Sequence, residues 1–259
     1  MTTLSSSTPG PLSDPLTHAR LRESVLEHLW QRVPNHCVIL TDLRLRPAID
    51  VAITRAARHG FYEPAQVRPF TVMMVMLGSH FDEDPFIPWA GEHLRRSARA
   101  TRRHAIADLL ATVSQHLEPL VGRHGEYYHR SLAWIGARTL DALAGTYAGD
   151  DEGLRLFVRH LYRRKHDGLG PVGVARVLHE AHAMAQRHGL ITPEGTLVMV
   201  GLVLLLGWGV DRDPFHPWVD EILSEPSRQD PETRARRLYA RALEVLARYS
   251  HLDALIRHV

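Results

Sequence analysis

FDEDPFIPW at residues 81–89 returns as VDRDPFHPW at residues 210–218, 129 positions further along the chain. The match extends backwards without a gap, since Arg58-His59-Gly60 aligns with Arg187-His188-Gly189. A self-match at such a long period predicts a duplicated structural unit. A residue present in both copies is expected to be architectural, whereas one present in a single copy is a candidate for a special role.

Helix start and stop signals punctuate almost the whole chain. Asp14 precedes Pro15 as an N-cap precedes a first-turn proline, and Gly60 and Gly189 stand where a left-handed C-terminal cap belongs. No stretch alternates with period two over a useful length, so strands are not expected. The signals predict helices over residues 15–33, 42–58, 64–77, 85–96, 101–121, 126–147, 151–165, 171–188, 193–206, 214–224 and 231–249. We therefore predict an all-α fold in which two duplicated multi-helix units pack as a bundle or a short helical array.

The repeat also predicts how the chain is divided. Residues 1–16 are polar, lack the basic start and apolar run of a signal peptide, and are expected to form a disordered leader. The first helical unit is expected over 17–122 and the second over 150–259. The segment 123–149 has no repeat partner, and we expect it to form a single connecting helix.

Composition indicates a globular protein of a reducing compartment. The 259 residues are 44% hydrophobic and 23% charged, with a net charge of +2. Cys37 is the only cysteine, which rules out an intramolecular disulfide. The longest apolar stretch, residues 196–210, is shorter than the ~20 residues that span a bilayer and is expected to be a buried core helix. Lys165 is the only lysine, and this arginine bias is typical of a GC-rich bacterial genome. We expect a cytoplasmic location.

The repeated DPFxPW string favours a structural role over a catalytic one. Asp84 and Asp213 each precede a proline, as N-cap residues of a short helix do, and Asp82 and Asp211 are expected to brace the preceding turn through their own backbone. The Phe and Trp of each copy lie three residues apart, hence on one helical face, and are expected to plug that helix into the core. The predicted structural residues are Gly78, Asp82, Asp84, Pro85, Phe86, Trp89, Gly207, Asp211, Asp213, Pro214, Phe215 and Trp218.

Three histidine-containing groups offer a metal-binding alternative. His80 with Asp82 and Asp84 has the oxygen and nitrogen ligands of a cation site, but the second copy has glycine in place of the histidine. His166-Asp167 is similar to the paired ligands of the helical HD phosphohydrolases, although GLGP follows at once. His179 and His182 are three residues apart, which does not match the four-residue spacing of HExxH zinc sites. We expect no metal site and no catalytic residues.

Residues 124–129 crowd two histidines and two tyrosines at the start of the unpaired segment. These are His124, Tyr127, Tyr128 and His129. They either line a pocket or form a patch on the surface of the helix start.

Two arginine clusters are candidate partner-binding surfaces. They comprise Arg95, Arg96, Arg99, Arg102 and Arg103 in the first unit, and Arg234, Arg236, Arg237 and Arg241 in the second. Such clusters suit an acidic protein partner steered by charge, while the plainer alternative is a solvated helix face. No aromatic residues are interleaved with the first cluster, which disfavours a platform that stacks single-stranded bases. Nucleic-acid binding through Arg95–Arg103 is therefore a weaker alternative to a protein partner.

The pattern GSxFDxDPxxPW, preceded by a helix that ends in RHG, resembles that of uncharacterised bacterial proteins. The resemblance covers residues 58–60 and 78–89, and again 187–189, 207 and 211–218, although Trp208-Gly209-Val210 departs from it. Genes of that family often lie near type VI secretion and polymorphic-toxin genes. The resemblance implies an adaptor, chaperone or immunity protein that acts through protein contacts.

We therefore expect a non-enzymatic protein-interaction module of a bacterial secretion or toxin system. Its partner would be another protein, such as an effector, a toxin or a secretion component, and no cofactor is expected. The alternative is a helical metal-dependent (phospho)hydrolase that uses His80, Asp82 and Asp84, or His166 and Asp167.

Overall fold

The computed structural model describes residues 14–97, 102–225 and 230–256. These residues form twelve α-helices and one short 3₁₀ helix and contain no strand, so the all-α prediction is confirmed. The α-helices are α1 (Pro15–Arg32), α2 (Pro34–Arg58), α3 (Pro64–Leu77), α4 (Pro88–Ser97), α5 (Arg102–Val121), α6 (Glu126–Gly136), α7 (Leu140–Tyr147), α8 (Asp151–Leu161), α9 (Arg163–Arg187), α10 (Pro193–Leu206), α11 (Pro217–Leu223) and α12 (Pro231–Ile256), with the 3₁₀ helix η1 over Val210–Arg212.

The first helix begins where the sequence places its cap. Asp14 adopts an extended backbone and its carboxylate accepts the N–H groups of Leu16 and Thr17. The predicted polar leader falls mostly on residues 1–13, which lie outside the described residues.

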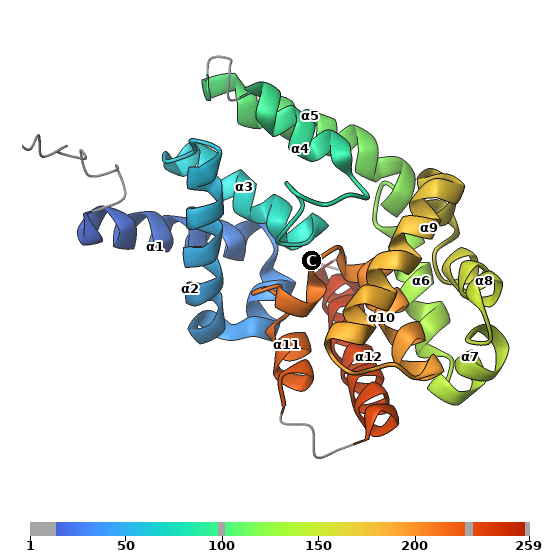
Figure 1. The fold of residues 1–259 in the computed structure, drawn as a ribbon. Helices are drawn as coiled ribbons and strands as arrows, with labels where there is room; N and C mark the ends of the chain where they lie inside the picture. Colours follow the sequence, from blue (N-terminus) through green and yellow to red (C-terminus); the bar gives the residue numbers. More distant parts are fainter. Residues whose placement is uncertain (1–13, 98–101, 226–229, 257–259) are drawn as a thin grey trace, which may run out of the picture.

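The helices form two groups on either side of the molecule (Figure 1). In the N-terminal half, which we define as α1–α5, the helices α1, α2 and α3 pack on one another and α5 packs on α3 and α4. In the C-terminal half, α8–α12, the helices α8, α9 and α10 pack in the same way and α12 packs on α10 and α11. The halves are joined crosswise, because α12 also contacts α2 while α5 contacts α9.

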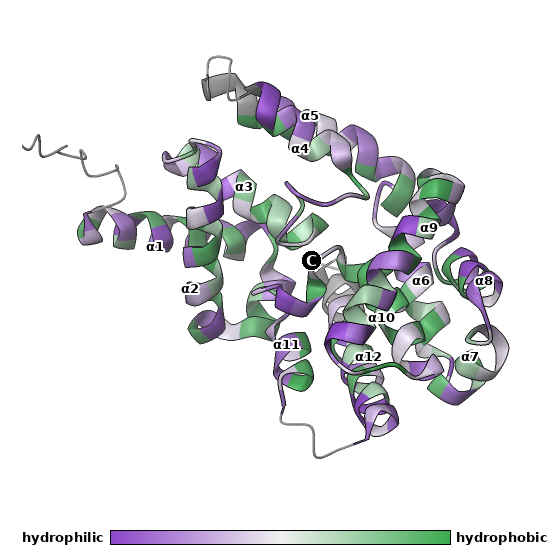
Figure 2. Ribbon diagram, viewed as in Figure 1, coloured by the Kyte–Doolittle hydropathy of each residue, from purple (hydrophilic) through white to green (hydrophobic). Residues whose placement is uncertain are grey.

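Two hydrophobic cores lie under these helices, one in each half. The N-terminal core runs from Leu21 to Val113 and the C-terminal core from Leu132 to Tyr249. Each half also lends one aromatic ring to the other, since Phe215 is buried in the N-terminal core and Phe86 packs against the C-terminal core. Figure 2 shows that the helices carry both hydrophobic and hydrophilic residues, as amphipathic helices around shared cores do.

The apolar stretch at 196–210 forms most of α10, and nine residues of this helix are buried. It contacts α7, α8, α9 and α12, and so is the central helix of its half. None of the helices in the described ranges combines the length and apolar character needed to cross a membrane.

The prediction of one connecting helix over 126–147 is wrong. The segment forms α6 and α7, which are separated by a turn at residues 137–139. Thr139 adopts an extended backbone and its hydroxyl accepts the N–H of Ala142, so α7 starts with its own N-cap. The turn is held from outside by Tyr239, whose hydroxyl donates to the carbonyl of Arg138 at 2.8 Å.

Unusual backbone geometry recurs at the 129-residue offset. Thr41 (φ 62°, ψ 157°) breaks α2 and Gly170 (φ 62°, ψ 179°) breaks α9 at the equivalent position. Gly60 and Gly189 follow the ends of these helices with φ of 77° and 64°, as the C-cap prediction requires. These recurrences agree with the alignment of the two copies, while a duplication as their origin stays a prediction.

Candidate functional site

The aspartates before Pro85 and Pro214 cap a turn, and the prediction that they cap the short helices is wrong. α4 begins at Pro88 and α11 at Pro217, three residues later than predicted, because the second proline of each DPFxP string provides the first-turn residue. Asp84 Oδ1 accepts the N–H of Phe86 at 2.7 Å, and Asp213 Oδ1 accepts that of Phe215 at 2.8 Å.

The same two carboxylates tie the halves together. Asp213 Oδ2 accepts the N–H of Ser79 at 3.0 Å, and Asp84 accepts the N–H of Trp208. Ser79 and Trp208 are equivalent positions, so each half donates a backbone N–H to the buried aspartate of the other. Both carboxylates are nearly inaccessible to solvent, at 6% and 2% exposure. Their main role in the fold is therefore to join the halves.

Asp82 and Asp211 were predicted to brace their own turn, and this is also wrong. Asp82 pairs with Arg55 and with His59, whose Nε2 lies 2.7 Å from Oδ2. Asp211 accepts from Arg187 and contacts His188, each at 3.0 Å. Burial acts to raise the pKa of Asp211, but the hydrogen bonds from His188 and Arg187 lower it to about 2. Each carboxylate ties the loop to the end of the preceding long helix.

The repeated aromatic residues differ in their surroundings. Phe215 and Trp218 are buried, at 1% and 5% exposure, but they lie in different cores. Phe215 also precedes the start of α11, so the prediction that the two rings share one helical face and plug the short helix into the core is wrong. Phe86 and Trp89 are only half-buried, and the Trp89 ring stacks on His116 with 4.3 Å between centroids. The two copies are thus unequal at this point, and the first copy leaves its aromatic rings beside a cavity.

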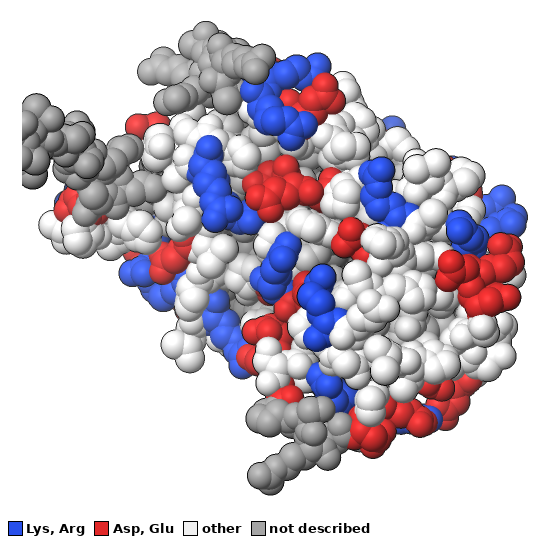
Figure 3. Space-filling model, in the orientation of Figure 1, with Lys and Arg blue, Asp and Glu red and all other residues white. Residues whose placement is uncertain are grey.

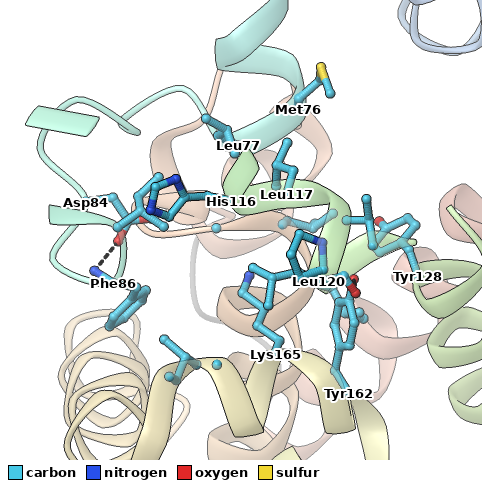
Figure 4. A pocket seen from close by; sticks show the side chains of 18 of the residues that line it. Met76, Leu77, Asp84, Phe86, His116, Leu117, Leu120, Tyr128, Tyr162 and Lys165 are labelled. Carbon is cyan, nitrogen blue, oxygen red and sulfur yellow. Dashed lines mark hydrogen bonds between the residues drawn. The ribbon is translucent and has the colours of Figure 1, made fainter. Parts of the chain in front are cut away.

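This cavity, which we name the lysine cavity, has a volume of about 400 Å³ and lies between α3, α5, α9, α10 and the loop before α4. Its lining is mainly apolar, and its polar members include Asp84, His116, Tyr128, Tyr162 and Lys165. In the view of Figure 4, Lys165 lies between Asp84 on one side and Tyr162 and Tyr128 on the other. Both halves of the chain therefore contribute to its wall.

Lys165 places a side-chain amine in this cavity. Its Nζ donates to the carbonyl of Leu204 near the end of α10 at 2.6 Å, which leaves two further N–H donors on the ammonium. Burial lowers the pKa of Lys165, while the charge of Asp84 acts to raise it. Burial raises the pKa of Asp84 to about 6, although its backbone hydrogen bonds and the Lys165 charge act to lower it. The cavity thus holds an amine whose pKa is lowered by burial, together with a carboxyl group whose pKa is about 6.

Tyr162 and Tyr128 both line the lysine cavity but make different contacts. The Tyr162 hydroxyl donates to the carbonyl of Leu120 at 3.3 Å, and burial raises its pKa. Tyr128 packs against the Tyr162 ring with 6.3 Å between centroids. Tyr162 is thus fixed by α5.

A second cavity of about 520 Å³ adjoins the first. It is lined by His36, His216 and Tyr249 and by the predicted cluster residues His124, Tyr128 and His129, so we name it the histidine cavity. Residues 124–129 were predicted either to line a pocket or to form a surface patch. The structure shows His124, Tyr128 and His129 lining a pocket. Tyr127 lies outside both cavities and lines a further pocket with Trp134 and Arg164.

The second arginine cluster does not form an open anion-binding face. Arg234 is buried, and it donates to the carbonyls of His188 and Leu223 at 3.0 and 2.8 Å. The predicted partner-binding role of Arg234 is therefore wrong. The guanidinium of Arg236 is bonded to Asp141 and Glu232, that of Arg237 to Glu225, and that of Arg241 to Glu244. These groups are occupied by carboxylates of the same chain.

Of the first cluster, Arg95 and Arg96 are exposed at the end of α4, and Arg96 pairs with Glu92 at 3.4 Å. Arg99 lies outside the described residues, as do the side chains of Arg102 and Arg103. On the face shown in Figure 3, acidic and basic side chains are interspersed.

The metal alternatives find little support in the geometry. His80 contacts Ser79 Oγ at 2.9 Å and accepts from Arg212 at 3.2 Å, so it belongs to the contact between the halves. His166 and Asp167 contact each other at 3.0 Å at the surface. His182 Nδ1 bonds to the carbonyl of Leu178. Within the described ranges, no three His, Cys, Asp or Glu side chains come together as a metal site would need.

Sequence reasoning missed Lys165, although the signal was present. It is the only lysine among 31 basic Lys and Arg residues, and the equivalent position in the first copy is His36. A position that differs between copies and carries the rarest charged residue was a candidate for a special role. No protein-family model matches this chain, and no curated protein or solved structure matches it either.

Proposed function

We propose that this protein is a non-enzymatic binding protein and that the lysine cavity holds its ligand. The observation that carries the proposal is the cavity itself, about 400 Å³ of mainly apolar wall at the contact between the two halves, with the only lysine of the chain in it. Ligand sites in proteins are typically apolar hollows between structural units, with a few polar groups that orient the ligand.

The chemistry of the wall supports an amphipathic ligand that ends in a carboxylate. Leucine, methionine and phenylalanine side chains suit an aliphatic or aromatic body. The two remaining donors of the Lys165 ammonium suit an anionic head group. Asp84 opposes an anion when it is ionised, and its pKa of about 6 means that this opposition weakens as the pH falls below neutrality.

Titration of the protein with dodecanoate tests the proposal, with the fluorescence of Trp89 and the other tryptophans or calorimetry as the readout. Lys165→Met keeps the stem and removes the charge, and we expect it to weaken dodecanoate binding about tenfold or more, because hydrogen bonds to charged groups contribute about 1.5–3 kcal/mol. Dodecanol is expected to bind both proteins equally, since it has no charge for Lys165 to recognise.

Arg163→Gln is the matched control, because Arg163 is an exposed cation two residues away that lies outside the lysine cavity. It is expected to leave dodecanoate binding unchanged. Equal affinity of dodecanoate for wild type and Lys165→Met, with both proteins folded, would refute the role of Lys165.

A second candidate function is the protein-interaction module implied by the family resemblance, an adaptor, chaperone or immunity protein of a secretion or toxin system. Two exposed apolar side chains favour it. Leu43 and Val172 occupy equivalent positions, each two residues after the break in α2 or α9, and are 82% and 74% exposed. Singly exposed apolar side chains are common in folded proteins, so it is their equivalent placement after the two helix breaks that favours a contact with another protein.

A pull-down from the lysate of the native bacterium tests this second candidate. We expect a stoichiometric partner with wild type and its loss with the double variant Leu43→Ser and Val172→Ser. The control is Ile191→Ser, since Ile191 is also an exposed apolar residue, at 72%, but does not follow a helix break. A partner retained by the double variant would place the contact elsewhere.

A further inference from the structure

The histidine cavity is the counterpart of the lysine cavity in the other copy. At the 129-residue offset, Lys165 corresponds to His36, Ile87 to His216 and Leu120 to Tyr249, and the first of each pair lines the lysine cavity while the second lines the histidine cavity. The two cavities therefore occupy equivalent places in the two halves. They differ in chemistry at these three positions.

The two cavities also adjoin. They share the lining residues Met76, Leu117, Val121, Tyr128, Leu205 and Leu206. Five of these six side chains are apolar, so the wall that the two cavities share is mainly apolar.

The polar end of the histidine cavity contains an unsatisfied group. His216 is 3% exposed, and its Nδ1 has no hydrogen-bond partner within the part of the chain that the structure describes. A buried polar atom without a partner is unfavourable and is rare in folded proteins. The His36 ring lies beside it, 6.0 Å away between centroids and stacked on Tyr249 at 4.3 Å.

We propose that the histidine cavity binds a hydroxyl group of the same ligand whose carboxylate lies at Lys165, so that the ligand is a bifunctional molecule with an apolar middle. This inference rests on the proposed function, because it assumes that the lysine cavity binds the carboxylate.

A hydroxyl suits this end better than a charged group does. Burial lowers the pKa of His36 to about 3, with a smaller contribution from His216, and burial also lowers the pKa of His216 despite the charge of Asp213. Both imidazoles are thus neutral near pH 7 and offer no net charge to an ion. A neutral imidazole nitrogen is either a donor or an acceptor, and a hydroxyl pairs with both.

The test compares dodecanoate with ω-hydroxydodecanoate, two probes that differ only at the far end. We expect wild type to bind the hydroxylated probe about tenfold more tightly, since the hydroxyl satisfies a buried partner. His216→Ile, which installs the residue found at the equivalent position 87, is expected to abolish this difference. It should leave dodecanoate affinity within about twofold of wild type, because the lysine end is intact.

Tyr249→Leu, which installs the residue of the equivalent position 120, is a second variant of the same end in case His216→Ile does not fold. It removes the ring that stacks on His36, and we expect it to reduce the preference for the hydroxylated probe. His182→Gln is the control, because His182 lies outside both cavities, and it should keep the full preference.

The outcomes separate the two proposals. Equal affinity of wild type for both probes, with dodecanoate binding still dependent on Lys165, overturns the hydroxyl site and leaves the proposed function standing. A preference that survives in both His216→Ile and Tyr249→Leu also overturns the hydroxyl site. Absence of binding for both probes overturns the proposed function and this inference together.

Discussion

Gly78 and Gly207 face each other across the contact between the two halves, each at the end of an apolar helix. A β-carbon on Gly78 would lie 3.0 Å from the carbonyl oxygen of Leu206, and one on Gly207 would lie 2.6 Å from that of Leu77. Both glycines have positive φ, 98° and 103°. The two copies therefore touch through the equivalent residue of each, and no side chain fits between them.

Substitution of either glycine by alanine is expected to destabilise the fold. We expect Gly207→Ala to cost about 2 to 4 kcal/mol in the free energy of unfolding, as a strained backbone and a close contact with a main-chain oxygen add up. Gly78→Ala should cost less, because its β-carbon has more room. Urea denaturation measures both, and Gly145→Ala in α7, which meets nothing within 4 Å, is expected to be neutral or stabilising.

The break in α2 holds Thr41 in a backbone conformation that suits glycine, as the equivalent Gly170 shows. Thr41 is exposed, so little packing is at stake. We expect Thr41→Gly to raise the free energy of unfolding by about 1 kcal/mol, since relief of strain exceeds the entropy that glycine adds to the unfolded chain. Gly170→Ala should lower it by about 1 to 2 kcal/mol. If Thr41→Gly lowers the free energy of unfolding and Gly170→Ala raises it, the backbone at the break is not strained.

The two repeated tryptophans are expected to differ in their contribution to stability. Trp218→Ala removes a ring that is 5% exposed and should cost about 3 to 5 kcal/mol. Trp89 is half-buried against His116 and lines the lysine cavity. Trp89→Ala should cost about 1 to 2 kcal/mol and should weaken ligand binding. Denaturant melts of both variants measure the difference, and a larger loss from Trp89→Ala would contradict it.

Two buried aspartates are expected to give opposite pH dependences of stability. Asp211 has a folded pKa of about 2 against a reference of 3.8. Its contribution of about 2 kcal/mol is present above pH 4 and lost as the pH falls toward 2, because the unfolded state then binds more protons. Asp84, with a folded pKa of about 6, does the reverse. Its ionisation costs about 3 kcal/mol near pH 7, and this cost disappears as the pH falls from 6 to 4.

Unfolding free energies measured from pH 3 to 8 test this assignment. Asp84→Asn should remove the gain in stability between pH 7 and 4, and Asp211→Asn should remove the loss below pH 4. Asp108→Asn, at an exposed position on α5, is the control and should leave the profile unchanged. If the stability profile of Asp84→Asn follows that of wild type, the pKa of Asp84 is the same in the folded and unfolded states, and the assignment is wrong.

The helices themselves are encoded locally. Asp14 and Pro15 start α1, Pro64 starts α3 and Pro193 starts α10. Gly60 lies just after α2 and Gly189 just after α9. Such signals act within one turn of the chain, so the sequence predicts them without any tertiary contact. Where local signals compete, prediction fails: Pro85 and Pro88 both suit a helix start, and α4 begins at Pro88.

Tertiary structure alone decides what the repeated residues do. The exchange of Phe86 and Phe215 between the cores, and of the Asp84 and Asp213 hydrogen bonds between the halves, depends on how two units meet across about 129 residues of chain. Lys165 becomes a cavity residue for the same reason. The sequence by itself determined an all-helical chain, because helix periodicity and capping are short-range. The cavities arise only from long-range packing of α3, α5, α9, α10 and α12, which no local pattern specifies.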